Sequence, residues 1–144
     1  MSFWSIIKDS IVDNYYIGIA AIVALVILVF SIIFACAINR HFKKGDNDLK
    51  IRVYYWLDIS YTLFITIISL FPLLGMFGTV KSLIGLGEIF QTGDDMNGIK
   101  AEFFLALTST ALGIIFSVIY KIINALFQPF IENQIDKARK TLGI

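Results

Sequence analysis

Small and hydroxyl-bearing residues recur at helical spacing in two apolar parts of this sequence. Towards the C-terminus, one residue in every three or four is small or polar, in the series Ala106, Thr110, Gly113, Ser117, Lys121, Asn124 and Gln128. The middle of the chain has a similar series, Asp58, Thr62, Thr66, Ser69, Pro72, Gly75, Gly78, Thr79, Ser82 and Gly85. Steps of three and four place side chains on one face of a helix. Hydroxyls on such a face could replace the water around a moving ion.

Two interpretations of these faces stay open, because packing and ion conduction use the same residue types. Small residues let membrane helices approach each other, and buried hydroxyls can bond to their own backbone. Packing alone is the better explanation for Thr62, Thr66, Ser69, Thr108 and Ser109. Pro72 could equally be a plain kink. An ion path instead needs polar groups that replace water without holding a charge permanently.

Enzyme chemistry is not expected, and neither is a metal or a cofactor. The only histidine, His41, lies in a basic segment with no second ligand beside it, and no hydrolase, metalloprotease or phosphate-loop motif is present. No carboxylate lies deep in an apolar run. If protons or sodium ions cross the membrane here, the titrating acid must come from another chain.

The elements that would position these residues are membrane helices. The chain has 144 residues, is 58% hydrophobic and contains three runs without charge, at 14–39, 59–80 and 103–120. About 20 apolar residues span a bilayer. The sequence therefore predicts a single all-α integral membrane domain with three transmembrane helices.

The expected boundaries follow from these runs. The spans are expected at about 15–38, 57–86 and 102–128, with a cytoplasmic loop at about 39–55, an external linker at about 88–100 and a cytoplasmic tail at 129–144. Pro129 is expected to bend the chain before a short tail helix. Ser31 and Cys36 are the only polar side chains between Ile17 and Ile38, so the first span suits contact with lipid.

Charge sets the expected orientation. Basic residues gather after the first span and in the tail, at Arg40, Lys43, Lys44, Lys50, Arg52, Lys121, Lys137, Arg139 and Lys140. The linker between the second and third spans holds Glu88, Asp94, Asp95 and Glu102 against Lys100 alone. By the positive-inside rule the first loop and the tail are cytoplasmic, and the N-terminus and the linker are outside.

Lys81 is the one charge near a span. Charges within a membrane are expensive and usually functional. A long lysine side chain near the outer end can also extend to the interface. The two interpretations weigh equally here.

Two stretches carry a family resemblance. "PLLGMFGTV", residues 72–80, resembles the P-L-L-G-x-x-G-T-V segment of the MotA/TolQ/ExbB proton channel family, and "LALTSTALGIIFSVIYKIINALF" resembles that family's last membrane helix. Together they cover about residues 69–127, in the family's order and with a short external loop between them. The first span matches only in position, apolar character and orientation.

The resemblance implies a ring of five chains around a single-span partner of the ExbD, TolR or MotB type, present as two copies in the bacterial inner membrane. The partner's aspartate would carry the ion, H⁺ or Na⁺. Thr79 and Thr110 would match the two hydroxyls that face this aspartate, with Ser117 on the same lining. Pro72, Gly75, Gly78 and Gly113 would shape the pore wall.

The chain departs from the family pattern at several places. Leu105 stands where many relatives have a glutamate, and Lys81 stands where an aromatic or apolar residue is common. The loop at about 39–52 and the tail are short. The leading hypothesis is a stator subunit that couples an ion gradient to movement of the partner. A non-conducting membrane scaffold is the alternative, and a holin-like or toxin-like pore is a third.

Overall fold

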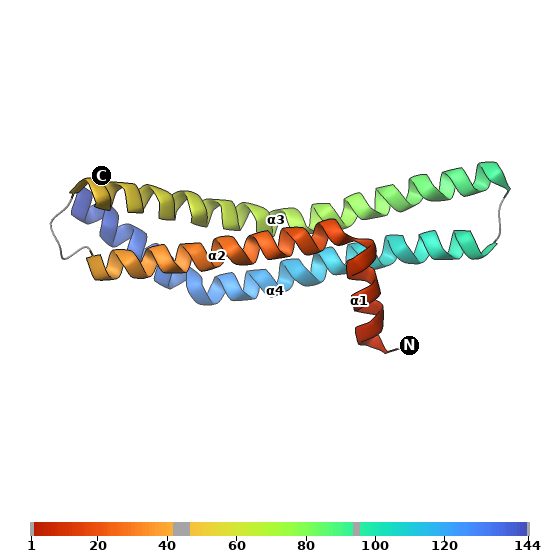
Figure 1. The fold of residues 1–144 in the computed structure, drawn as a ribbon, viewed down its shortest axis with the longest axis horizontal. Helices are drawn as coiled ribbons and strands as arrows, with labels where there is room; N and C mark the ends of the chain where they lie inside the picture. Colours follow the sequence, from red (N-terminus) through yellow and green to blue (C-terminus); the bar gives the residue numbers. More distant parts are fainter. Residues whose placement is uncertain (1, 42–46, 94–95, 144) are drawn as a thin grey trace. The chain divides into compact units, whose positions relative to one another are not determined.

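The computed structural model describes residues 2–41, 47–93 and 96–143, and all regular structure in these ranges is helical. Helix α1 spans Phe3–Asp13, α2 spans Tyr15–His41, α3 spans Asn47–Thr92 and α4 spans Met96–Leu142 (Figure 1). Three of them, α2, α3 and α4, are long and apolar enough to cross a membrane. The prediction of an all-α protein with three membrane spans is confirmed. The ring of five stays a prediction.

Helices α3 and α4 extend well beyond the lengths expected for their spans. They contain 46 and 47 residues, or about 70 Å each at 1.5 Å per residue, against a hydrocarbon core of about 30 Å. Much of the expected loop, linker and tail is thus helical, at 47–55, 88–92, 96–100 and 129–142. Intrahelical hydrogen bonds do not need lipid, so a helix can continue where the sequence turns polar. Five charged residues of the expected loops, Lys43, Lys44, Asp46, Asp94 and Asp95, lie outside the described residues.

The ends of α3 and α4 each have a glycine directly after the last helical residue. Gly93 has φ 69° and Gly143 has φ 70°. This left-handed conformation closes many helices, and glycine adopts it without steric cost. Gly93 therefore ends α3 and marks the start of the polar turn expected between the second and third spans.

Pro129 does not end helix α4, which continues through it to Leu142. The expected separate tail helix is wrong in this respect: it is the last part of α4. Proline removes one backbone donor from the helix. Because only one backbone hydrogen bond is lost, the residues before and after Pro129 stay helical.

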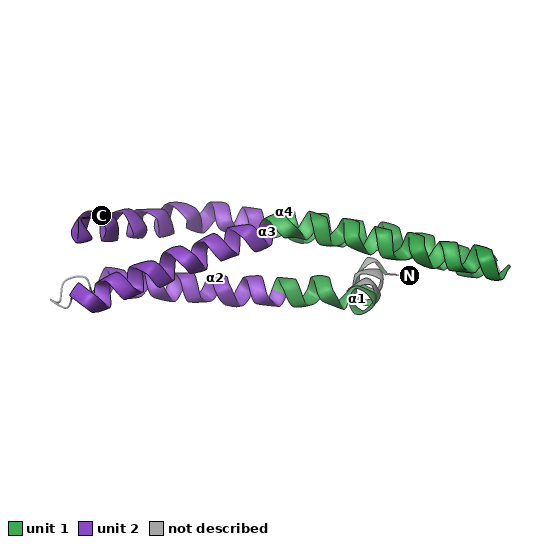
Figure 2. Ribbon diagram, turned by 90° about the horizontal axis from the view of Figure 1, so that it is seen from above, with its two compact units in different colours: residues 1–21, 69–119 green, residues 22–68, 120–144 purple. Residues whose placement is uncertain are grey.

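The chain divides into two compact units (Figure 2). Unit 1 comprises residues 1–21 and 69–119, and unit 2 comprises residues 22–68 and 120–144. In unit 2 the buried positions of α2 and α3 alternate in steps of three and four: Ala24, Leu28, Ser31, Ala35 and Ile38, and Tyr54, Leu57, Tyr61, Phe64 and Ile68. This alternation is typical of helices that pack at small crossing angles, side chain between side chains.

Helix α2 has a small-residue face that its hydropathy does not reveal. Ala24, Ser31 and Ala35 are completely buried, and the Ser31 hydroxyl donates to the carbonyl of Ile27 at 2.9 Å. Cys36 is exposed. The first span is therefore not uniformly suited to lipid, because alanine counts as apolar on a hydropathy scale although its size favours helix contact.

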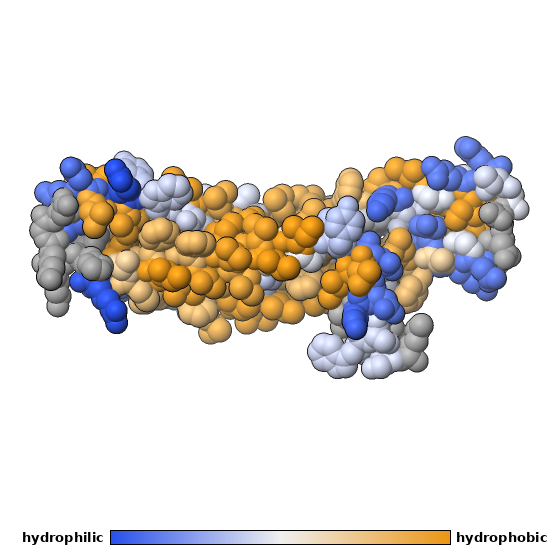
Figure 3. All heavy atoms as spheres, in the orientation of Figure 1, coloured by the Kyte–Doolittle hydropathy of each residue, from blue (hydrophilic) through white to orange (hydrophobic). Residues whose placement is uncertain are grey.

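The outward faces of the long helices are strongly apolar. Large side chains that are about half exposed or more include Ile22, Phe30, Leu63, Phe77 and Val118. Figure 3 shows hydrophobic residues over the middle stretches of the helices and hydrophilic residues at their ends. A soluble protein rarely exposes so much apolar surface. Lipid contact accounts for it.

Candidate functional site

Two glycines bring the backbones of α3 and α4 together in unit 1. A Cβ placed on Gly113 would lie 2.6 Å from the carbonyl oxygen of Phe71 and 2.9 Å from the Cα of Gly75. A Cβ on Gly75 would lie 3.1 Å from the carbonyl oxygen of Ser109. No side chain fits between these backbones. The glycines therefore set the distance between the two helices at this level.

Thr79 and Thr110 meet one turn from this contact. Their Oγ1 atoms lie 2.5 Å apart and share a hydrogen bond. Thr79 also lies within hydrogen-bonding distance of the carbonyls of Gly75, at 3.2 Å, and Ala106, at 3.4 Å. Thr110 approaches the Gly75 carbonyl at 3.5 Å. Both threonines are half-buried.

The threonine pair has acceptor capacity to spare. The two hydroxyl protons are used within the pair and on the neighbouring carbonyls. Each hydroxyl oxygen carries two lone pairs, and only one of the four accepts from the partner threonine. The pair can therefore accept a hydrogen bond from a protonated carboxyl or coordinate a small cation.

Gly78 supplies a second close contact in the same unit. A Cβ there would lie 2.6 Å from both Cβ and Oγ of Ser109. The atom nearest to this position is the hydroxyl of Tyr16, which donates to Asn14 Oδ1 at 3.0 Å. The Tyr16 ring also packs edge-on against Phe77, with centroids 5.9 Å apart. The start of α2 thus packs on α3 at Gly78, where the missing side chain leaves room for Tyr16.

Ser109 belongs to the contact although the sequence pattern gave it no functional role. It is completely buried, and its hydroxyl donates to the carbonyls of Ala106 at 3.0 Å and Gly75 at 3.3 Å. Thr108 and Thr66 bond to carbonyls of their own helices. These bonds agree with the packing interpretation of all three residues. Only a small side chain fits against Gly78 at this distance. The small size of Ser109 was therefore the sequence feature that could have indicated its place in the contact.

The structure does not bring all expected site residues together. Ser117 is buried two turns along α4 from Thr110 and makes no hydrogen bond with the threonine pair. Pro72 is half-buried and lies within α3, one turn before Gly75. Lys81 is exposed and forms no ion pair with any residue in the described ranges. Its exposure fits both interpretations of this lysine.

The same contact between α3 and α4 holds two further polar groups towards the end of α3 at Thr92. Gly85 lies against the carboxylate of Glu102, since a Cβ there would lie 3.0 Å from its Cδ. One turn further in, Ser82 is 1% exposed and its hydroxyl has no hydrogen-bond partner among the described residues. Most buried hydroxyls find a partner.

Unit 2 carries a polar chain of its own. The Tyr61 hydroxyl donates to Asn124 Oδ1 at 3.3 Å, and Asn124 Nδ2 donates to Gln128 Oε1 at 3.5 Å. Gln128 Nε2 continues to Glu132 Oε1 at 2.9 Å. The first of these bonds joins α3 to α4, and the other two run along α4 on the polar face that the spacing of Asn124 and Gln128 predicts.

A second bond between α3 and α4 lies near the end of α4. Arg139 donates from Nε and Nη2 to the Tyr54 hydroxyl, both at 3.3 Å. In the described ranges, no three His, Cys, Asp or Glu side chains come close enough to hold a metal ion.

The comparison with protein families gives one match. The model of the MotA/TolQ/ExbB proton channel family matches residues 56–140, more than half of the chain and the part that contains both threonines. Comparisons with curated proteins and with solved structures found no match. The family match confirms the resemblance seen in the two sequence motifs.

Proposed function

The chain belongs to the MotA/TolQ/ExbB proton channel family, and we propose that it is the ion-conducting stator subunit of a rotary motor. In this proposal H⁺ or Na⁺ moves down its gradient across the bacterial inner membrane. The movement of the ion turns or displaces a partner protein. The chain itself catalyses no chemical reaction.

The observation that carries the proposal is the hydrogen-bonded pair of Thr79 and Thr110. Its unused lone pairs match what an ion path needs, which is a replacement for water that binds weakly enough to release the ion. A protonated carboxyl could donate to the pair and leave again. A sodium ion could use the same oxygens.

The ion carrier is proposed to come from a partner. The long helices have their carboxylates near the span ends, as at Asp58 and Glu102, and none lies between residues 59 and 80 or 103 and 120. Members of this family generally work with single-span partners of the ExbD, TolR or MotB type. We infer that two copies of such a partner supply the aspartate that meets Thr79 and Thr110.

The proposed assembly is a ring of five chains with α2 outermost. One face of α2 is buried within the chain, while large apolar side chains such as Leu25, Val29 and Ile33 are about half exposed. Such a surface suits lipid better than an aqueous pore. In this arrangement α3 and α4 surround the partner helices, with the N-terminus outside and the tail in the cytoplasm.

A non-conducting membrane scaffold is the second candidate. The hydroxyls of Thr66, Thr108 and Ser109 bond to backbone carbonyls, as hydroxyls do in plain helix packing. A pore formed by this chain alone, of the holin or toxin type, is less well supported. Such a pore would need an acidic or strongly amphipathic span. In α2, α3 and α4, apolar and polar residues are only weakly separated between opposite faces of the helix.

The test is reconstitution of the chain with the product of a neighbouring reading frame that encodes one membrane helix with an aspartate. We expect both chains to purify together, with five copies of one and two of the other in an image or by native mass spectrometry. Liposomes with the complex should conduct H⁺ or Na⁺, and replacing the partner's aspartate by asparagine should stop conduction. A stable complex without any ion flux would support the scaffold instead.

A further inference from the structure

Helices α2 and α3 line an open, groove-like apolar cavity in unit 2. Its volume is about 480 Å³, within the range of about 300–1,000 Å³ typical of small-molecule sites. Phe30 and Phe34 of α2 and Trp56 and Leu63 of α3 are the large apolar side chains in its walls. Ser60 also lines it, and its short side chain leaves space that a larger residue would fill.

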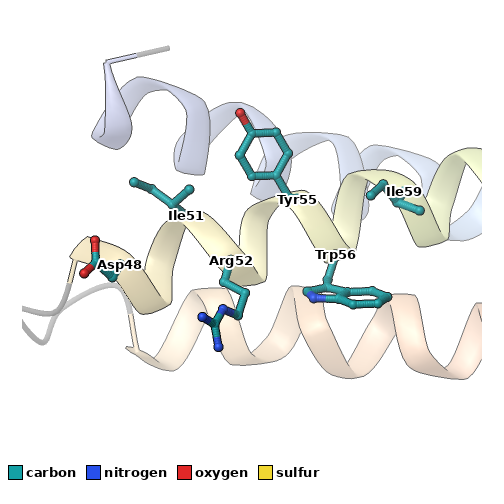
Figure 4. Close-up of a pocket in the computed structure, with 6 residues that line it drawn as sticks. All are labelled: Asp48, Ile51, Arg52, Tyr55, Trp56 and Ile59. Carbon is teal, nitrogen blue, oxygen red and sulfur yellow. The ribbon is translucent and has the colours of Figure 1, made fainter.

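Arg52 is the one cation among the described residues that line this cavity, and it lies at one end. Arg52 lines it together with Trp56, and Figure 4 shows both side chains on the side of α3 that faces α2. From Arg52 to Leu63 the cavity follows eleven residues of α3, or about 16 Å. The cavity thus has a charged end near the start of α3 and an apolar end within the span.

The charge of Arg52 is not used within the described part of the chain. The guanidinium forms no ion pair or hydrogen bond there. Asp48, one turn earlier, lines an adjoining cavity of about 430 Å³ with Arg52 but does not pair with it. Arg139, by contrast, is bound to Tyr54. Among the described residues, therefore, no group occupies the Arg52 guanidinium, and it can bind an external anion.

We propose that this cavity binds an anionic phospholipid, with an acyl chain between α2 and α3 and the phosphate on Arg52. The apolar walls match the chain, and a guanidinium can bind two phosphate oxygens at once. Basic groups between membrane helices are known to recognise anionic headgroups. Trp56 suits the level of the headgroups, where tryptophan is enriched. The proposal requires only that the chain spans a membrane, so it does not depend on ion conduction.

A helix of another chain is a poorer occupant. The cavity is open on one side, so its volume does not decide between the two occupants, but its charge does. The apolar face of a membrane helix would place uncharged side chains against Arg52. An acyl chain with a phosphate end matches both the apolar walls and the charge.

The experiment is native mass spectrometry of the purified full-length protein titrated with phosphatidylglycerol or with phosphatidylcholine of the same acyl chains. We expect phosphatidylglycerol to bind at least about fivefold more tightly, the contribution of one basic residue near a lipid surface. Arg52→Gln should remove this preference. Lys140→Gln is the matched control, because it removes an equal charge from an exposed site in the last turn of α4.

Ser60→Leu provides a second variant that keeps Arg52. Leucine should fill the apolar end of the cavity and lower the affinity for both lipids by a similar factor. Equal effects of Arg52→Gln and Lys140→Gln, or no preference in the parent protein, would reduce the cavity to ordinary lipid contact and overturn the proposal. A dimer that appears when lipid is removed would assign the cavity to a second copy of the chain.

Discussion

The hydroxyl oxygens of Thr79 and Thr110 lie 2.5 Å apart although 31 positions separate the two residues in the sequence. Their meeting depends on the glycine contact one turn away, where the backbones of α3 and α4 approach too closely for a Cβ at Gly113. The glycines therefore do more than allow packing. They bring two hydroxyls from different helices into one polar site.

The first prediction concerns Thr110→Val and Thr79→Val. Valine keeps the shape of threonine but removes the hydroxyl, so the ion or the protonated carboxyl loses a ligand. An unmet hydrogen bond of this kind costs roughly 1–3 kcal/mol. We expect Thr110→Val to abolish gradient-driven activity and Thr79→Val to weaken it, with assembly largely intact. Ion flux and subunit count should be measured on the same preparation.

Thr108→Val is the control for the threonine variants. Position 108 lies about 200° around the helix from position 110. Among the described residues, its hydroxyl bonds only to the carbonyls of Phe104 and Leu105. This variant should conduct like the parent. Normal activity in both Thr79→Val and Thr110→Val would mean that these hydroxyls serve packing only.

The second prediction concerns Gly113→Ala. Its Cβ would lie 2.6 Å from the Phe71 carbonyl oxygen and 2.9 Å from the Gly75 Cα, both backbone atoms. The helices must separate to admit it, which should lower stability by about 1–3 kcal/mol and reduce activity through the displaced threonines. Thermal unfolding in detergent and ion flux would measure the two effects.

Gly87→Ala is the matched control in the same protein. Gly87 lies in α3, and a Cβ there would have no neighbouring atom within 4 Å. Alanine there should stabilise the helix by about 0.5–1 kcal/mol. If Gly113→Ala were as harmless as Gly87→Ala, the close contact between α3 and α4 would not set the site geometry.

The third prediction is the orientation of the chain. With Cys36 replaced by alanine, a cysteine introduced at Thr92, in the last turn of α3, should react with an impermeant maleimide added outside intact cells. A cysteine at Thr141 should react only after permeabilisation. Both residues are exposed, so accessibility depends on the side of the membrane. The reverse labelling pattern would overturn the assignment made from the distribution of charge.

The expectation that Thr79 and Thr110 form one site came from the family resemblance, and helical spacing indicated only the face on which each residue lies. Steps of three and four select Thr110 and Gly113 on one helix and Gly75 and Gly78 on the other, without knowledge of the contact. The spacing cannot say which residues of one helix face which of the other. That information arises from packing, and Ser109 was assigned to packing alone for this reason.

Other features lay beyond the sequence for equally physical reasons. Hydropathy does not distinguish a buried alanine from a lipid-facing one, so the small face of α2 at Ala24, Ser31 and Ala35 was missed. The helices extend past the expected spans because a membrane limits the apolar run but not the backbone hydrogen bonds. The cavity beside Arg52 arises from the sizes of residues on two helices and has no local signature.

The last prediction concerns Ser82→Ala. Ser82 is 1% exposed and its hydroxyl lacks a partner among the described residues, a state that costs roughly 1–3 kcal/mol when a polar group is buried. Alanine removes the polar group with little change in volume, so we expect unchanged or slightly higher stability and unchanged ion flux. Ser31→Ala is the control: Ser31 is equally buried, but its hydroxyl donates to the Ile27 carbonyl at 2.9 Å, so its removal should bring no gain. If Ser82→Ala instead raised stability while reducing flux, the hydroxyl would have a ligand during conduction, and the ion path would extend from the threonine pair towards Glu102. A loss of stability in Ser82→Ala would show that the hydroxyl is satisfied in the membrane.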